Sequence, residues 1–433
     1  MHRRDETMEV LILFGSFFLM LIFRVPIALT LIISSLFTGL YMGIDLGALI
    51  QRMVRGLDSF SLLAIPFFIL AGEIMNEGGI SRRLINLANV IIGKIRGGLA
   101  MVNVLASTFF GGISGSALAD TSSLGSVLIP MMKKQKYDTD YTVAVTVSSS
   151  IQGVLIPPSH NMIIYATAAG GVSVGALFVG GLVPGLLLAL GIMVLTYIIA
   201  IKRNYPVGEP VKKEDIPKIV WDGLLGLFTV VIIMGGILSG FFTATESAAI
   251  AVLYAFIITF FVYREIPISR MGVILEKSFR TLAMVLFLIA ASSSFGWLLA
   301  LLKVPAMVSD LLLTISPNDA VTLLIIMLIL LLLGTVMDMA PLILIATPIL
   351  LPVAVDAGMD PVHFGVMLML ALGVGLITPP VGSVLFVGSA IGRISIERAT
   401  KGLLPFYAVM VIVLLLVVYV PQLSLFLPNL LGQ

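Results

Sequence analysis

The chain has 433 residues, of which 59% are hydrophobic and only 11% are charged, and its formal net charge is +2. So little charge cannot cover the surface of a water-soluble domain of this length, and the near-neutral balance gives no reason to expect a nucleic-acid partner. Cysteine is absent, which excludes disulfides, thiolate metal sites and thiol nucleophiles.

Apolar runs of about 20 residues recur along the whole chain, which indicates an all-α polytopic protein whose main partner is the lipid bilayer. In the first third of the chain we predict membrane crossings at about 8–23, 26–44 and 60–76. The first run lacks a small-residue cleavage site, so we expect a retained helix rather than a signal peptide. The stretch 80–95 carries Arg82, Arg83 and Lys94 among apolar residues, and we expect it to lie along the membrane interface.

Two unusual segments follow. Residues 98–132 are rich in Gly and Ser at their centre, and their apolar arms are each too short to span comfortably, so we predict a re-entrant hairpin. The apolar run at about 139–170 contains Pro157 and Pro158, which lack backbone N–H groups and cannot continue a helix. We therefore predict a broken helix, because freed backbone is tolerated at membrane depth only where it lines a cavity or is buried in protein.

The rest of the chain repeats this plan. A crossing at about 175–200 leads into 202–218, a long polar segment that we interpret as the linker between two halves. Further crossings are predicted near 219–238, 244–262, 281–301 and 402–420. The remaining segments are an interfacial stretch at 266–280, a second hairpin at 319–353 and a second broken helix at 361–391, around Pro379 and Pro380.

The two breaks reveal an internal repeat. Pro157 aligns with Pro379 at a separation of 222 residues, and the same separation pairs Gly153 with Gly375. Each half then holds five crossings and one hairpin, and because five is odd, equivalent elements point in opposite directions. With the N-terminus outside, most of the basic residues fall on the cytoplasmic side. An inverted-topology repeat with paired broken helices is typical of alternating-access transporters.

The breaks also indicate where ligands bind. Carbonyl groups at the end of one half-helix suit Na⁺, and N–H groups at the start of the next suit an anionic substrate. We predict Na⁺ ligands where each hairpin tip meets a break: Ser114, Ser150 and Gly153 in the first half, and Asp338, Gly373, Gly375 and Thr378 in the second. We predict substrate contacts between the tips, at Ser116, Asp120, Ser159, Asn161 and Ser383, and expect Ser159, Asn161 and Ser383 to cap the second half-helices.

Each feature also has a plainer interpretation. The proline pairs could be simple kinks, and the small residues at the first tip could be helix-packing surface. Asp338 is the one acid deep in the second hairpin, so it is either a cation ligand or proton carrier, or it is paired with a neighbouring hydroxyl. The run Gly112–Gly115 matches the Gly-x-Ser-Gly of intramembrane serine proteases, with His160 as an imaginable base. That match explains neither the repeat nor the second break, so we expect no enzyme.

Several stretches resemble the large membrane subunit of tripartite ATP-independent periplasmic (TRAP) transporters. They are Gly97–Val104, Phe110–Ala117, Ala119-Asp120, Ile129-Pro130 and Ile156–Ser159. The resemblance implies a Na⁺-driven importer of organic acids in the bacterial inner membrane. It also implies two partners, a small four-helix membrane subunit and a periplasmic substrate-binding protein. The sequence Pro-Pro-Ser-His-Asn at 157–161 looks more similar to members that carry sialic acid than to those that carry C4-dicarboxylates.

The resemblance further implies an elevator mechanism, in which a transport domain slides against a scaffold. Carried onto this chain, the transport domain would be 98–172 and 319–392, with arms at 80–95 and 266–280. The scaffold would comprise 1–97, 173–280 and 393–433, and 281–318 would lead into the second hairpin. Few residues precede the first helix, so we expect the small subunit to be a separate chain. The rival interpretation is a stand-alone Na⁺/dicarboxylate symporter, which needs no binding protein.

Overall fold

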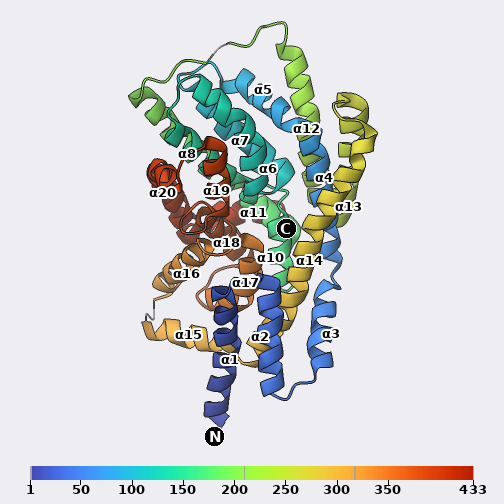
Figure 1. Ribbon diagram of the computed structural model, residues 1–433, viewed down its shortest axis with the longest axis vertical. Coiled ribbons are helices and arrows are strands. Elements are labelled where there is room, and N and C mark those ends of the chain that lie inside the picture. Colours follow the sequence, from blue (N-terminus) through green and yellow to red (C-terminus); the bar gives the residue numbers. More distant parts are fainter. Residues whose placement is uncertain (1, 209, 316–317, 433) are drawn as a thin grey trace.

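The computed structural model describes residues 2–208, 210–315 and 318–432. Within these residues the fold is all-helical, apart from one isolated bridge between Arg96 and Val207. The helices of the first half are α1 His2–Ile22, α2 Ile27–Tyr41, α3 Leu46–Leu57, α4 Ala64–Glu77, α5 Ile80–Ile92, α6 Gly98–Ser114, α7 Ala117–Lys134, α8 Thr139–Ser150, α9 Gln152–Leu155, α10 His160–Ala168 and α11 Val174–Lys202 (Figure 1).

The second half begins after the polar linker. Its helices are α12 Ile216–Leu238, α13 Ala244–Ile257, α14 Met271–Leu301, α15 Val304–Ile315, α16 Asp319–Gly334, α17 Met339–Asp356, α18 Pro361–Leu376, α19 Ser383–Gly392, α20 Ile396–Tyr419 and α21 Gln422–Leu430. Short 3-10 and π segments extend this set: Phe60–Leu63 before α4, Ile258–Tyr263 after α13 and Ile268–Arg270 before α14.

Seven helical segments in the described part of the chain are long and apolar enough to cross a membrane. They are Phe60–Glu77, Val174–Lys202, Ile216–Leu238, Ala244–Tyr263, Ile268–Leu301, Met339–Asp356 and Ile396–Tyr419. Six of them match predicted crossings. The seventh is α17, the second arm of the predicted second hairpin, so its length alone does not distinguish a re-entrant arm from a crossing.

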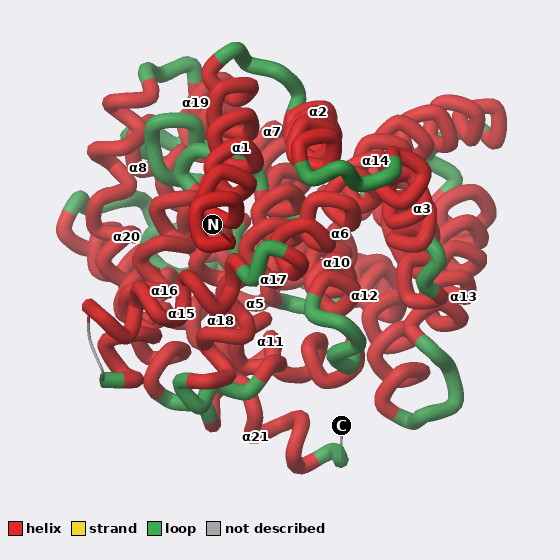
Figure 2. Tube along the Cα trace, turned by 90° about the horizontal axis from the view of Figure 1, so that it is seen from below, coloured by secondary structure: helices red, strands yellow, loops and turns green. Residues whose placement is uncertain are grey.

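The helices form two groups that face each other. Helices α6–α10 lie with α16–α19 on one side of the molecule, and α3, α4, α12, α13 and α14 lie on the other (Figures 1 and 2). Within the first group, α16 packs on α18 and α19 packs on α7; within the second, α3 packs on α14 and α13 packs on α4. The two predicted hairpins therefore share one side, with α6–α7 in the upper half of Figure 1 and α16–α17 in the lower half.

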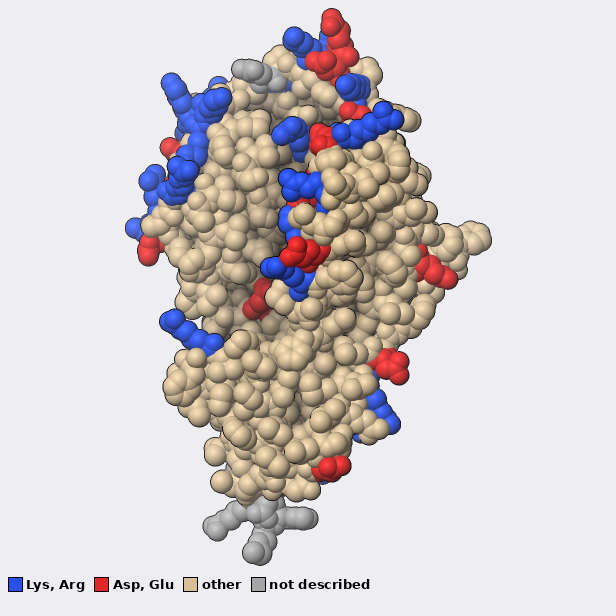
Figure 3. Space-filling model, turned by 45° about the vertical axis from the view of Figure 1, so that its right-hand side comes forward, with Lys and Arg blue, Asp and Glu red and all other residues tan. Residues whose placement is uncertain are grey.

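Charge is concentrated at one end of the molecule. On the face drawn in Figure 3, Lys and Arg side chains gather at the upper end and continue part of the way down a furrow, and little charge lies below. The linker between α11 and α12 lies at this basic end (Figure 1). The positive-inside rule therefore supports a cytoplasmic upper end.

The linker is attached to the helices beneath it. Gly97 donates a backbone hydrogen bond to the Pro206 carbonyl (2.9 Å), and Arg203 forms an ion pair with Asp138 (2.8 Å). The Tyr205 hydroxyl also donates to Asp138, and this bond together with the guanidinium of Arg203 lowers the pKa of that carboxyl. Glu209, which belongs to the predicted linker, lies outside the described residues.

One expectation about the second half is wrong. The stretch at 266–280 is not a separate interfacial segment, because α14 runs without interruption from Met271 to Leu301 and joins it to the predicted crossing at 281–301. No Gly or Pro occurs between Val273 and Phe295, so no helix-breaking residue ends α14 near Arg280. The amphipathic helix before the second hairpin is instead α15, which begins 224 residues after α5 and so matches the repeat.

Two short helices were not predicted. Helix α3 follows its capping residue Asp45, whose side chain accepts a hydrogen bond from the Gly47 backbone (3.2 Å), and the helix packs along α14. Helix α21 follows Pro421 and packs against α11. Both are shorter than a crossing, so the search for runs of about 20 apolar residues could not find them.

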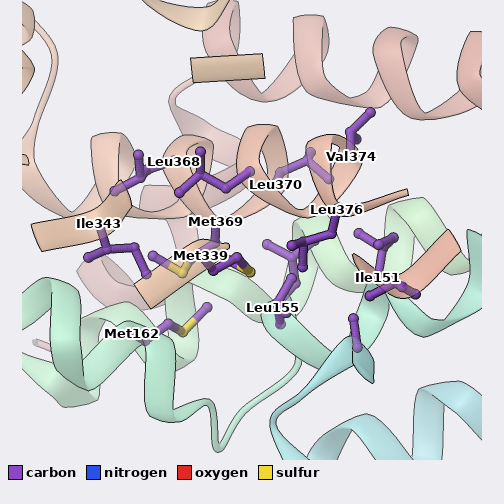
Figure 4. Close-up of a cluster of buried hydrophobic side chains, with 14 of the residues drawn as sticks. Ile151, Leu155, Met162, Met339, Ile343, Leu368, Met369, Leu370, Val374 and Leu376 are labelled. Atoms are coloured by element: carbon purple, nitrogen blue, oxygen red, sulfur yellow. The ribbon is translucent and has the colours of Figure 1, made fainter. Parts of the chain in front are cut away.

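Both helix breaks are present. The first half-helix ends at Leu155 and the next begins at His160; the second break lies between Leu376 and Ser383. Each break contains a cis Pro-Pro bond. Figure 4 shows where the two halves meet: Leu155 and Met162, from either side of the first break, pack with Met339 and Leu376 of the second half.

Candidate functional site

The backbone of each hairpin, near its tip, contacts the backbone of a broken helix at a pair of glycines. In the first half, a Cβ on Gly111 would lie 2.8 Å from the Gly153 Cα, so only hydrogen fits between α6 and α9. In the second half, a Cβ on Gly375 would lie 2.5 Å from the Gly334 Cα. The repeat that pairs Gly153 with Gly375 is thus also a repeat of contacts, and it brings backbone of each tip against backbone of a break.

The tips then turn directly over the breaks. Gly115 ends α6 with φ +60°, and a Cβ there would lie 2.7 Å from the Pro158 carbonyl oxygen. In the second half, Val381 donates a backbone hydrogen bond to the Thr335 carbonyl (3.0 Å). Polar backbone freed by the prolines is therefore covered by hairpin backbone, as irregular structure inside a membrane protein requires.

The two tips, the two breaks, the start of α2 and helix α14 line a cavity of about 660 Å³. It brings together four of the residues predicted from the sequence: Ser116 and Asp338 from the two tips, and Asn161 and Ser383 from the two breaks. The opposite wall comes from the start of α2 and the middle of α14, and includes Pro26, Leu29, Thr281, Met284 and Leu288. Sequence reasoning missed this wall, because these residues lie in ordinary apolar helices without any break.

Two predicted substrate residues do not reach the cavity. Asp120 is fully buried on the first turn of α7, where one carboxylate oxygen accepts a hydrogen bond from Ser107 (3.0 Å). Ser159 is also buried, with the Gly115 turn packed over its backbone. Direct contact between a bound substrate and either side chain is therefore not available in this arrangement.

The predicted capping bonds are also wrong. Ser159 occupies the position before α10 but makes no capping hydrogen bond, and its buried hydroxyl has no partner within the described residues. Asn161 instead points its amide at the Met339 sulfur (3.7 Å), across the two halves. Ser383 follows Gly382, a residue with φ +40°, and α19 has no side-chain cap.

The predicted Na⁺ ligands have mixed surroundings. Hydroxyls of Ser150 and Thr378 donate to carbonyls in their own helices, Val147 (2.8 Å) and Val374 (2.8 Å), which leaves hydroxyl lone pairs available. Ser114 accepts a hydrogen bond from the Ser116 backbone (3.4 Å). Gly153, Gly373 and Gly375 are buried inside α9 and α18, and each lies close to backbone or side chains of another helix.

Asp338 stands directly before α17 and lines the cavity without making a side-chain cap. Among the described residues, no basic side chain lies within ion-pair distance of it. No hydroxyl in this part of the chain donates a hydrogen bond to its carboxylate either, so the plainer interpretation, pairing with a neighbouring hydroxyl, does not apply here. His160 lines the same cavity. A serine protease dyad needs a hydrogen bond between its serine and its histidine. Within the described residues, His160 and Ser114 make no such bond.

Known proteins are similar over nearly the whole chain. Residues 14–423 match the family model of the tripartite ATP-independent periplasmic transporter, DctM component. The chain is 45% identical over 424 residues to the uncharacterized protein YgiK of Salmonella typhimurium, covering 97% of each protein. It is 43% identical over 388 residues to the sialic acid TRAP transporter large permease protein SiaM of Vibrio cholerae, covering 90% of each.

A solved structure shares the fold. The YdaH transporter of Alcanivorax borkumensis superposes with a TM-score of 0.62 at 13% sequence identity, covering 86% of this chain and 88% of that one. At this identity the likeness concerns the arrangement of helices alone.

Proposed function

This chain belongs to the family of the DctM component of tripartite ATP-independent periplasmic transporters, and on that premise we propose that it imports an organic acid in symport with Na⁺. It is a multi-pass membrane protein and the large permease subunit of its transporter. The substrate class that we favour is sialic acid and related sugar acids, because the relative SiaM is named for sialic acid and the Pro-Pro-Ser-His-Asn break favoured it independently.

The cavity carries this proposal. Residues of both tips and both breaks line it, and its volume of about 660 Å³ is within the range of small-molecule sites. Its polar side chains are three hydroxyls, an amide, an imidazole and a carboxylate, from Ser116, Thr281, Ser383, Asn161, His160 and Asp338. These groups suit a sugar acid, which needs hydrogen-bond partners along its length as well as at its carboxylate.

The coupling ions are expected beside the cavity rather than in it. Na⁺ takes oxygen ligands, and the carbonyls at the ends of α9 and α18 with the hydroxyls of Ser114, Ser150 and Thr378 supply them. No group of three or more His, Asp or Glu side chains that could hold a metal ion occurs among the described residues. The donors that we propose are backbone and hydroxyl oxygens at the two tip–break contacts, with the Asp338 carboxylate beside the second.

The proposed movement is that of an elevator. Helices α7, α9, α10 and α17–α19 carry one part of the cavity lining, and α2 and α14 carry the rest. Sliding the first group along the second would move the substrate with its binding groups from one side of the membrane to the other. In this proposal both hairpins are re-entrant, a small membrane subunit holds the scaffold, and a periplasmic binding protein delivers the substrate.

Uptake in proteoliposomes tests the proposal. The chain is reconstituted with its small subunit, and uptake of labelled sialic acid and of labelled succinate is measured with and without an inward Na⁺ gradient and the binding protein. We expect uptake of sialic acid that needs both. Uptake that needs Na⁺ alone would indicate a stand-alone symporter, uptake of succinate alone would replace the substrate, and uptake of neither acid would contradict the proposal.

A further inference from the structure

A second polar region lies farther along the same helices, toward the end of the molecule opposite the basic surface. It consists of two adjoining depressions of about 710 Å³ and 410 Å³. Both are lined by Arg55, Gly56, Thr167 and Ser293, so they form one continuous region, which we call the outer vestibule. Its walls come from the end of α3, the end of α10 and the second half of α14, with loops on one side.

The vestibule is built for an anion. Arg52 and Arg55 are three residues apart on α3 and so lie on one face of that helix. Both are exposed, and within the described residues neither has a carboxylate within ion-pair distance. Arg52 lies over the ring of Trp297, with its guanidinium carbon 5.0 Å from the ring centroid. Hydroxyl side chains complete the lining: Ser59, Ser61, Thr167, Ser173, Thr243 and Thr245.

The cavity described above lacks this charge. No Lys or Arg lines it, and its one ionisable acid, Asp338, repels a carboxylate. Recognition of a carboxylate there must depend on dipoles alone. A guanidinium, by contrast, binds a carboxylate through two parallel hydrogen bonds and keeps its charge at any physiological pH.

The same three helices line both sites at different levels. On α10 the cavity is lined by Asn161 and the vestibule by Thr167, six residues farther on, a rise of about 9 Å. On α17 the lining moves from Pro341 to Leu344. On the scaffold helix α14 it moves from Leu288 to Ser292. A displacement of α10 and α17 by about this rise would place Asn161 opposite Arg55.

We propose that Arg55, assisted by Arg52, is a carboxylate-binding site on the scaffold that completes the substrate site only when the transport domain is at the outer end. Anions arriving from outside meet both guanidinium groups, and the inward displacement removes the substrate from them. Affinity for the anion is then high outside and low inside, which favours release into the cytoplasm. This inference rests on the proposed function, because it needs a carboxylate substrate and a moving transport domain.

The test compares charge-removing and charge-keeping variants. Arg55→Gln, Arg52→Gln and the double variant remove the cations, Arg55→Lys keeps one, and Lys303→Gln removes an exposed cation that lines neither site. In the complete transporter with its binding protein, the half-saturating concentration of labelled sialic acid for uptake, or of succinate if that acid is transported, is measured from outside. Efflux from preloaded vesicles gives the corresponding value from inside.

We expect Arg55→Gln to raise the outside value roughly tenfold, the double variant to raise it further and Arg55→Lys to restore part of the loss. The inside value and the Lys303→Gln variant should stay within about twofold of wild type, by the same reasoning about lost contacts. Equal changes on both sides, or no change in the double variant, would overturn the arginine site. So would loss of binding-protein docking to the Arg55→Gln transporter, since the arginines would then contact protein.

The two hypotheses fail separately. Wild-type vesicles that take up neither acid would contradict the proposed function, and the arginine site would fall with it. Wild-type vesicles that take up an acid, with variants that behave like wild type, would overturn the arginine site and leave the proposed function standing.

Discussion

Asp338 shows how one residue position links sequence to mechanism. The sequence singles it out as an acid in an apolar hairpin, and the fold places it at the cavity between both tips. Because no basic side chain within the described residues pairs with it, its charge is available to a ligand. Intramembrane acids of this kind are costly to keep unless they serve a function.

We therefore expect Asp338→Asn to reduce Na⁺-dependent uptake by more than tenfold, because the carboxylate supplies negative charge beside the second tip. Asp319→Asn is the matched control, since Asp319 is an exposed acid at the start of the same hairpin. The measurement is initial uptake rate together with the unfolding temperature in detergent. Full uptake in Asp338→Asn, or loss of folding rather than of transport, would remove Asp338 from the mechanism.

At the same scale, the sequence predicted Asp120 and Ser159 as substrate contacts, but neither residue lines the cavity. Both stand next to motifs that line the cavity, Ser116 and Asn161 respectively. Within a helix, residues four apart share a face, but Ser116 precedes α7 in extended backbone and its side chain caps the helix, so it need not point the same way as Asp120. Asp120 turns toward Ser107 of α6, and Ser159 turns beneath the tip.

Elements meet at the glycine crossings, where the contacts of the two halves differ in tightness. A Cβ on Gly375 would lie 2.5 Å from the Gly334 Cα, and one on Gly111 would lie 2.8 Å from the Gly153 Cα. A Cβ on Gly153 would find its nearest neighbour at 3.4 Å, an ordinary contact. Backbone cannot move aside as a side chain can, so the first two substitutions must separate helices.

We expect Gly375→Ala and Gly111→Ala each to destabilise the protein by about 1–3 kcal/mol, and Gly153→Ala by less. Gly296→Ala on α14 is the control, because no atom lies within 4 Å of the added methyl. The order of destabilisation is measured by thermal unfolding in detergent, with the loss of monodisperse protein as the readout. If Gly153→Ala were the most damaging of the four, the backbone crossing described for each break would be incorrect.

The boundaries of the helices were predicted well only where the local sequence contains a residue that ends a helix. The breaks were predicted closely because two adjacent prolines end a helix whatever surrounds them. The interfacial stretch at 266–280 was misjudged because basic residues among apolar ones indicate an interface without indicating where a helix ends. Helix α15 contains one acid and no basic residue, so it lacked this signal of an interfacial helix. The internal repeat nevertheless makes α15 the equivalent of α5.

The whole molecule is organised as two groups of helices that share the cavity, and their relative position is open to measurement. The chain contains no cysteine, so pairs introduced into it are the only thiols present. Thr167 and Ser293 both line the outer vestibule, one on α10 and one on α14. Asn161 lies about 9 Å farther along α10, in the direction of the basic end.

We expect Thr167→Cys with Ser293→Cys to cross-link in the arrangement described here. Asn161→Cys with Ser293→Cys should cross-link only after an outward displacement of the first group of helices. Cross-linking by a short bismaleimide, measured as a shift in gel mobility, would report the two positions, and Na⁺ and substrate should change their ratio. A fixed ratio under all conditions, with active protein, would argue against the elevator movement.

The sequence by itself determined the class of protein, the number and place of the breaks, the repeat and four of the residues at the cavity. These features follow from local physical chemistry: apolar length, the missing N–H of proline and the cost of a charge in lipid. Tertiary structure alone decided which side chains face the cavity, that Thr281 and Met284 form its opposite wall, and that Arg52 and Arg55 lie one to two turns beyond it. Such relations join residues far apart in the chain, and they depend on the angle at which helices pack, which no single segment encodes.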